Sequence, residues 1–180
     1  QRKLPVLFDN EITIHNSSSI IRHLEKIQIE PKLIPDNPKE RSQAQIIENW
    51  ADTTLAKSIK IVFLEEIMKS PTLISSLLPN EISDSMQKFI VNIPLNIGSK
   101  ISGLISQEKK ESLKLNLKYL TNLIEKENFI VGKELSLADI SVASQLSLLS
   151  FPKSSGEHLK GKGCSIYIND PNLKNLFKWR

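Results

Sequence analysis

The chain has 180 residues, of which 39% are hydrophobic, 6% aromatic and 24% charged. This composition is that of a soluble globular protein of one or two modest domains, and it excludes collagen-like and disordered chains. The longest uncharged runs, at 140–152, 89–99 and 70–80, are shorter than the roughly 18 residues that a membrane-spanning helix needs. We therefore expect no membrane span.

The charge balance is weakly basic, with a formal net charge of +4 and a pI near 9.1. The cations are 20 lysines and only 4 arginines, and no basic block exceeds two adjacent residues. Aromatic residues that could stack on bases are sparse. The sequence therefore predicts no nucleic-acid partner.

Cysteine and histidine usage points to an intracellular protein without a metal. The single cysteine, Cys164, cannot form an internal disulfide, and the basic start of the chain lacks the apolar run of a secretory signal. His15, His23 and His158 do not share the spacing of a metal site. We expect a cytoplasmic location and no metal site.

Residues 1–27 read as strand, strand and helix. Val6–Phe8 precede a predicted two-residue turn at Asp9-Asn10, and Ile12 and Ile14 then alternate with polar residues. A helix follows, capped by Asn16 or Ser17, with an apolar stripe at 20, 24 and 27. Because an isolated hairpin is marginal in water, we expect this section to be the later part of a larger sheet domain.

Residues 28–35 contain two prolines and read as a linker, and the chain from 36 to 180 is predicted to be all-helical. Asn37-Pro38 starts a helix whose buried face includes Trp50, and Ser70-Pro71 starts a short helix that runs to Leu78. The segment 92–98 is expected to be irregular. Leucine and isoleucine at 113, 117, 120 and 124 predict a long amphipathic helix over about 101–126.

The sharpest helix start is Ser136-Leu137-Ala138-Asp139, a capping box flanked by the hydrophobic pair Leu135 and Ile140. The run 140–151 is apolar or small on nearly every side, which predicts a central buried helix. A glycine-containing loop over 153–169 and a last helix from Asp170-Pro171 to the end complete the chain. A general acid or base role for Asp139 is less favoured than this structural one.

Five separate segments, taken in order, resemble the glutathione transferase superfamily. The capping box together with 129–132 is the most specific match. The others are Leu4-Pro5-Val6-Leu7, His15-Asn16-Ser17-Ser18-Ser19-Ile20, the stretch 34–43, and Asp170-Pro171-Asn172-Leu173 with Trp179. The resemblance implies an incomplete thioredoxin-like section over 1–27 and, after the 28–35 linker, an all-helical domain over 36–180. The fold class is therefore expected to be α+β and mostly α.

The resemblance also implies a glutathione site. Leu4, before a cis Pro5, would pair its backbone with the cysteinyl part of glutathione, and Ser17 would hold the γ-glutamyl carboxylate at a helix start. Asn16 stands where the family has Asp, Glu or Gln, so the charge pairing to the ligand's ammonium is lost. The alternative is that Asn16 and Ser17 only cap a helix and Pro5 only shapes a turn.

The resemblance implies an enzyme that conjugates the glutathione thiolate to a small apolar electrophile, in a cleft that Trp50 could border. Such an enzyme would be a cytoplasmic homodimer with a role in detoxification. The family's catalytic Tyr, Ser or Cys would lie upstream of Gln1, so no catalytic residue is named. Two alternatives stay open: a non-catalytic transferase-like protein-interaction module, and a glutathione-dependent thiol–disulfide member of the superfamily.

Two further signals carry less weight. The segment 156–163 matches a phosphate-loop spacing except that Gly163 replaces the final Ser or Thr, and it is read as a solvated loop. Cys164 has lysines at 160 and 162 nearby, but a partly buried, unreactive thiol is the favoured interpretation.

Overall fold

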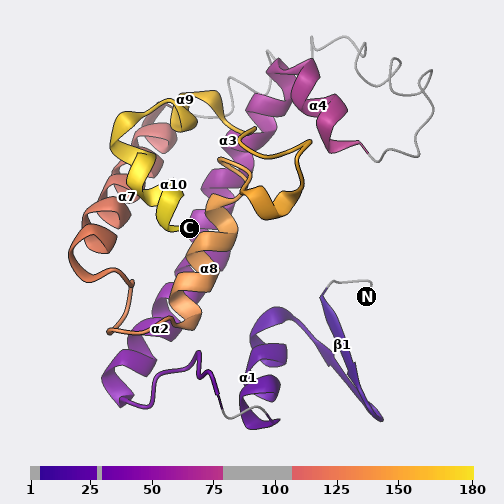
Figure 1. Cartoon of the computed structure of the whole chain (residues 1–180), viewed down its shortest axis with the longest axis vertical. Helices are drawn as coiled ribbons and strands as arrows, with labels where there is room; N and C mark the ends of the chain where they lie inside the picture. The colour runs from indigo at the N-terminus through magenta and orange to yellow at the C-terminus, as the bar shows by residue number, and fades with distance from the viewer. Residues whose placement is uncertain (1–4, 28–29, 79–106) are drawn as a thin grey trace.

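The computed structural model describes residues 5–27, 30–78 and 107–180 (Figure 1). Leu4, and with it the Leu4–Pro5 bond, lies outside these residues, as do the predicted irregular segment 92–98 and the first residues of the helix predicted from about 101. The chain begins with a hairpin and one helix, which we call the hairpin section, and continues into a larger helical section.

The hairpin section follows the predicted order. β1 (Val6–Asp9) pairs antiparallel with β2 (Ile12–His15) in a register that sets Val6 opposite His15 and Asp9 opposite Ile12. Asn10 makes the turn with a φ of 52°, a left-handed conformation that asparagine tolerates. α1 (Ser17–Ile27) then packs on the hairpin, and the His23 Nε2 lies 2.7 Å from the Asp9 carboxylate.

The helical section is built along one long axis. α2 (Pro38–Trp50), the π-helical turn η1 (Ala51–Leu55) and α3 (Ala56–Lys69) follow one another without a break. Asn37 caps α2, because its Oδ1 accepts from the amides of Lys39 at 2.9 Å and Glu40 at 3.4 Å. Ser70 caps the short α4 (Pro71–Leu77) in the same way.

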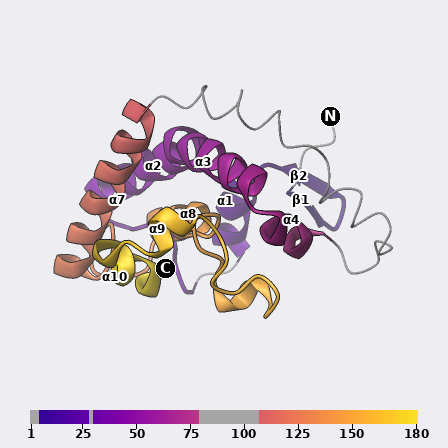
Figure 2. The ribbon, with the colours of Figure 1, turned by 90° about the horizontal axis from the view of Figure 1, so that it is seen from above.

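Two helices pack along this axis. α7 (Gln107–Glu127) buries the predicted stripe at 113, 117, 120 and 124, and α8 (Leu137–Leu146) contacts α2 and η1. Figure 2 shows α7 across one flank of the axis and α8 beside it. The short elements η2 (Lys153–Ser155), α9 (Ser165–Ile168), η3 (Pro171–Leu173) and α10 (Lys174–Trp179) complete the section, and α10 packs on α7.

The central helix is shorter than predicted. α8 ends at Leu146, not near Phe151, because the backbone of 149–151 pairs with 161–164: Cys164 N donates to Leu149 O and Phe151 N donates to Lys162 O, each at 2.8 Å. Gly163 permits this approach, since a Cβ there would lie 2.3 Å from Leu149 O. The segment 153–169 is correspondingly not a plain loop, because it contains η2 and α9.

The linker is held to both sections through backbone groups. The Glu25 carboxylate of α1 accepts from the amides of Leu33 at 2.6 Å and Ile34 at 3.4 Å. Leu33 O accepts from the amide of Leu137, the first residue of α8, at 2.8 Å. The linker therefore connects the end of α1 directly to the start of the central helix.

The described ranges contain no helix whose length and apolar character would let it cross a membrane.

Among the described residues of the helical section, Asp139 is the buried carboxylate that accepts the most hydrogen bonds. It is 2% exposed, and its oxygens accept from Ile130 N at 2.8 Å, Ser136 N at 2.8 Å and Ser136 Oγ at 2.7 Å. The bonds join the start of α8 to the segment that follows α7. A carboxylate with this set of partners has a structural role.

We expect Asp139→Ala to destabilise the protein by about 2–5 kcal/mol, because two buried amides lose their acceptor. For a chain of this size that loss lowers Tm by about 5–15 °C in a thermal melt followed by circular dichroism. Asp139→Asn keeps one acceptor oxygen, so its Tm should lie between that of the parent protein and that of Asp139→Ala. An unchanged Tm for Asp139→Ala would contradict the role given to this carboxylate.

A second buried carboxylate joins α3 to α7. Glu65 of α3 is 7% exposed and forms ion pairs with Lys69 of the same helix and with Lys110 of α7, the latter at 2.8 Å. Burial by itself would raise the pKa of Glu65, but hydrogen bonds from Lys110 and Lys69 outweigh it and hold the pKa below its usual 4.5. Its ionised form therefore stabilises the fold.

The stability that Glu65 adds should depend on pH in a defined direction. Because its pKa is lower in the folded state, its contribution is complete above the unfolded pKa and disappears as the pH falls through the folded pKa. Glu65→Gln should cost about 1–2 kcal/mol at pH 7, since both lysines are partly solvated. Urea unfolding of both proteins at pH 7 and pH 3 tests this. If the difference in unfolding free energy between the parent and Glu65→Gln is larger at pH 3 than at pH 7, the role given to Glu65 is wrong.

Candidate functional site

The start of α1 holds the residues that the sequence assigns to glutathione. Asn16 has a φ of 66°, and its Oδ1 accepts from the amide of Ser19 at 2.9 Å while its carbonyl accepts from Ile20 N at 3.1 Å. Asn16 is therefore the cap of α1, with its side-chain oxygen directed at the first turn. From the sequence alone, either Asn16 or Ser17 could have been the cap.

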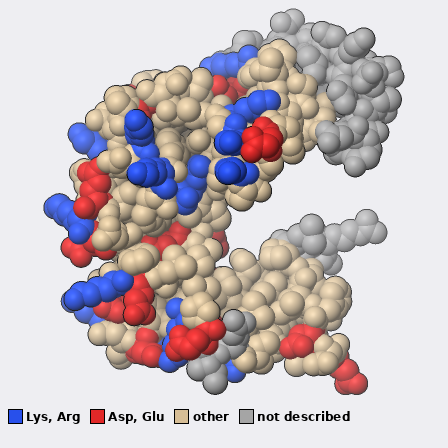
Figure 3. Space-filling view, in the orientation of Figure 1, with Lys and Arg blue, Asp and Glu red and all other residues tan. Residues whose placement is uncertain are grey.

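Ser17 is the first residue of α1, and its side chain is exposed. The first amides of a helix have no partner within the helix, and they lie at the positive end of its dipole. Figure 1 shows that α1 begins on the side of the hairpin section that faces the long axis, and Figure 3 shows a wide hollow between the hairpin section and the upper part of the helical section. This first turn has the chemistry of an anion site.

Ser18 connects the same turn to the helical section. Its hydroxyl donates a hydrogen bond to Oε1 of Glu48, which lies on α2 and is 5% exposed. Glu48 was not among the residues predicted from the sequence. Its position, four residues after the buried Ala44, marks it as facing the interior of the fold, but the partner lies 30 residues away in the chain.

Of the other residues assigned to glutathione, Pro5 is exposed at the start of the described chain. Leu4 lies outside the described residues. Their roles therefore remain predictions from the resemblance.

Trp50 lines a different part of the molecule. It borders a cavity of about 550 Å³ between α2 and α7, with Ile46 and Tyr119 at the surface. Residues two apart on an α-helix point about 200° from one another, so Trp50 lies on the side of α2 opposite Glu48 and α1. The structure thus does not bring Trp50 and Ser17 into one cavity.

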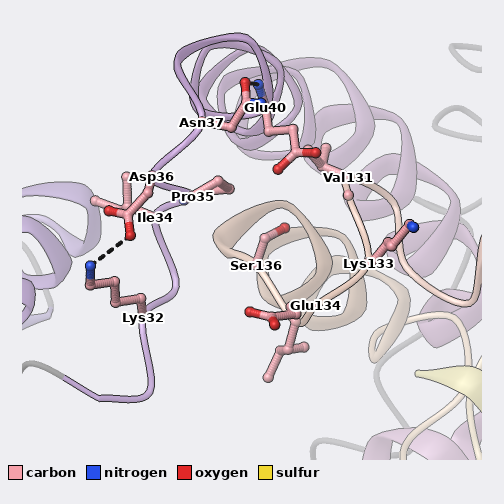
Figure 4. Close-up of a pocket in the computed structure, with 12 residues that line it drawn as sticks. Lys32, Ile34, Pro35, Asp36, Asn37, Glu40, Val131, Lys133, Glu134 and Ser136 are labelled. Atoms are coloured by element: carbon pink, nitrogen blue, oxygen red, sulfur yellow. Dashed lines mark hydrogen bonds and ion pairs between the residues drawn. The ribbon is translucent and has the colours of Figure 1, made fainter.

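A cavity of about 350 Å³ lies where the linker meets the helical section (Figure 4). Lys32 and Asp36 form an ion pair at 2.7 Å on the linker side, and Glu134 and Ser136 lie on the other side. The Lys32 contacts hold the pKa of Asp36 below its usual value. Ser136 already donates its hydroxyl hydrogen to Asp139, so it has no donor left for a ligand.

A third cavity, of about 410 Å³, lies between α3, α7 and α9 and is lined by Glu65, its two lysines and Tyr167. Next to it, Cys164 is fully buried. Burial, with the charges of Glu66 and Glu65, raises the pKa of Cys164 to about 12, and burial likewise raises the pKa of Tyr167 to about 12. Both groups stay protonated at neutral pH, so neither is a ready nucleophile.

The described ranges contain no group of three or more His, Cys, Asp or Glu side chains that could hold a metal ion.

Comparisons with known proteins identify the fold. No family model matches the sequence. FtsZ-localized protein A of Caulobacter vibrioides is 24% identical over an alignment of 151 residues that covers 82% of this chain and only 56% of that protein's length.

Two solved structures align with almost the whole chain. A glutathione S-transferase from Rhodospirillum rubrum F11 matches with a TM-score of 0.52 and 22% identity over 97% of this chain and 70% of its own. The β-etherase LigF from Sphingobium sp. strain SYK-6 matches with a TM-score of 0.50 and 19% identity over 99% of this chain and 79% of its own. The hairpin, α1 and the helical section thus form a glutathione transferase-like fold, with a thioredoxin-like start followed by a helical bundle.

Proposed function

We propose that this protein binds glutathione at the first turn of α1 and conjugates the glutathione thiolate to a small apolar electrophile. The observation that carries the proposal is Ser17, exposed at the first position of α1 in a transferase-like fold. One of the solved structures with this fold is a glutathione S-transferase.

The first turn suits one end of glutathione. The γ-glutamyl carboxylate would accept from the free first-turn amides and from the Ser17 hydroxyl, and the helix dipole favours its negative charge. The backbone of Leu4 would pair with the cysteinyl part. The protein would act as a cytoplasmic homodimer, with detoxification as its role.

In the reaction, the glutathione thiol loses its proton to solvent and the sulfur attacks an electrophilic carbon. A carbon–sulfur bond forms while the leaving group departs with its bonding electrons. The protein's contribution would be to orient the thiolate and to stabilise its charge. None of the described residues is assigned the activating role.

A second candidate is a protein-interaction module that contacts FtsZ. The observation that favours it is the similarity to FtsZ-localized protein A over 82% of this chain. Asn16 adds support, because its uncharged amide already accepts from Ser19 N. Ile46 and Tyr119, which are 68% and 67% exposed, offer apolar surface for such a contact. The thiol–disulfide alternative would need a cysteine upstream of Gln1, a role that the buried Cys164 does not fill.

The test of the first proposal is retention of the full chain on immobilised glutathione, with release by free glutathione. Ser17→Ala should lower glutathione affinity about ten- to a hundredfold, because a hydrogen bond to a charged group contributes roughly 1.5–3 kcal/mol. Ser112→Ala, at an exposed position of α7, is the matched control and should bind like the parent. Failure of the folded parent protein to bind would refute the proposal.

The second candidate makes a different prediction. The full chain should co-sediment with polymers of FtsZ from the same organism, and Ile46→Lys with Tyr119→Lys should abolish this without lowering Tm. Ser17→Ala should leave the co-sedimentation unchanged. Absence of the chain from the polymer pellet would exclude this candidate.

A further inference from the structure

The excess positive charge of the protein is concentrated in residues 153–180. This segment contains six lysine and arginine residues and two acidic residues, a net charge of +4, whereas residues 1–152 contain 18 residues of each sign. The segment therefore carries a charge equal to the net charge of the whole chain. In the fold it supplies the loop between α8 and α9, α9 itself, η3 and α10.

Five lysines of this segment are exposed, three on the loop between α8 and α9 and two on α10. We call them the basic face: Lys153, Lys160, Lys162, Lys174 and Lys178. In Figure 3, blue side chains gather over this loop and over α10, on one side of the molecule. The fold thus collects on one surface lysines that form no basic run in the sequence.

Few acidic groups neutralise the basic face. The two acids of the segment are Glu157, which lies 3.4 Å from Lys160, and Asp170, which lies 3.9 Å from Lys114 of α7. The other four lysines of the basic face form no ion pair within the ranges that the structure describes. Like charges on one surface repel one another, so these lysines do not stabilise the fold.

The backbone of the loop is held in place. Phe151 N donates to Lys162 O at 2.8 Å, and Gly161 N donates to Phe151 O at 2.9 Å. The Lys162 Nζ also donates to the Ser76 hydroxyl of α4. The loop therefore presents its charges from a fixed backbone, which lowers the entropy that a partner must remove on binding.

We propose that the basic face docks an acidic segment of a partner protein. Exposed carboxylates on such a segment would complement the unneutralised lysines, and complementary charge of this kind speeds encounter and selects partners. The basic face includes neither the first turn of α1 nor the exposed pair Ile46 and Tyr119. The inference therefore goes beyond the proposed function.

Two other anionic partners fit the surface less well. Binding of single-stranded nucleic acid uses exposed aromatic rings, but Tyr167 is buried and Phe177 and Trp179 are half-buried. A helix that lies in a membrane surface needs a free apolar face, but Leu176 of α10 is fully buried and α10 packs on α7.

The test is fluorescence anisotropy of the full chain with a labelled peptide of about ten glutamates as the acidic probe. The parent protein should bind the peptide saturably. Raising sodium chloride from about 0.05 M to about 0.3 M should weaken binding, because salt screens exposed charges. The combined variant Lys153→Gln, Lys160→Gln and Lys162→Gln should bind about tenfold more weakly, because three exposed ion pairs of modest strength are lost.

A matched control removes the same charge elsewhere. Lys39→Gln, Lys126→Gln and Lys133→Gln, combined, change exposed lysines at the end of the helical section where α2 and α8 begin and α7 ends. This control should bind the peptide like the parent protein. The basic-face variant should keep the Tm of the parent and its retention on immobilised glutathione, so a failure of this inference is distinct from a failure of the proposed function.

Loss of peptide binding in the basic-face variant alone supports the inference. Equal loss in both combined variants would show that net charge, not the basic face, attracts the peptide, and would overturn it. Absence of peptide binding by the parent would do the same. Tighter binding of the parent to a DNA duplex or to phosphatidylserine vesicles than to the peptide would assign the surface to nucleic acid or to a membrane instead.

Discussion

The helical section depends on the three hydrogen bonds that the Asp139 carboxylate accepts. They fix the start of α8 to the segment after α7, and α8 in turn packs on α2 and η1. The amide of Leu137, two residues before Asp139, donates to the linker carbonyl of Leu33. One buried carboxylate thus sets the position of the central helix, and through it the place where the hairpin section attaches.

The hairpin section is fastened to the rest of the chain at both ends of α1, each time by a carboxylate. Glu25 near the end of α1 accepts from two linker amides, and Glu48 of α2 accepts from Ser18 in the first turn. The first turn that would receive glutathione therefore owes its position to the helical section. A substitution in α2 can therefore alter binding at α1 without touching the ligand.

Local rules predicted much of this fold. The Asp9-Asn10 turn and the capping box at Ser136 and Asp139 were predictable because each depends on residues within a few positions. Contacts between distant segments were not: Glu48 meets Ser18 across 30 residues, and a periodicity argument has no means of pairing them. The predicted end of α8 was wrong for the same reason, because a backbone bridge between Ser150 and Gly163 outweighs the helix preference of the apolar run. In the candidate site, the start of α1 could be predicted from the sequence, whereas the Glu48 carboxylate beside it could not.

The central claim is that the first turn of α1 binds glutathione, and a titration of the isotope-labelled full chain with glutathione, followed by amide NMR shifts, tests it most directly. We predict saturable shifts of the Ser17, Ser18 and Ser19 amides, with smaller changes in α2 around Glu48. Saturable binding with shifts confined to the α2–α7 face around Ile46 and Tyr119, or no shifts at all, would contradict the account.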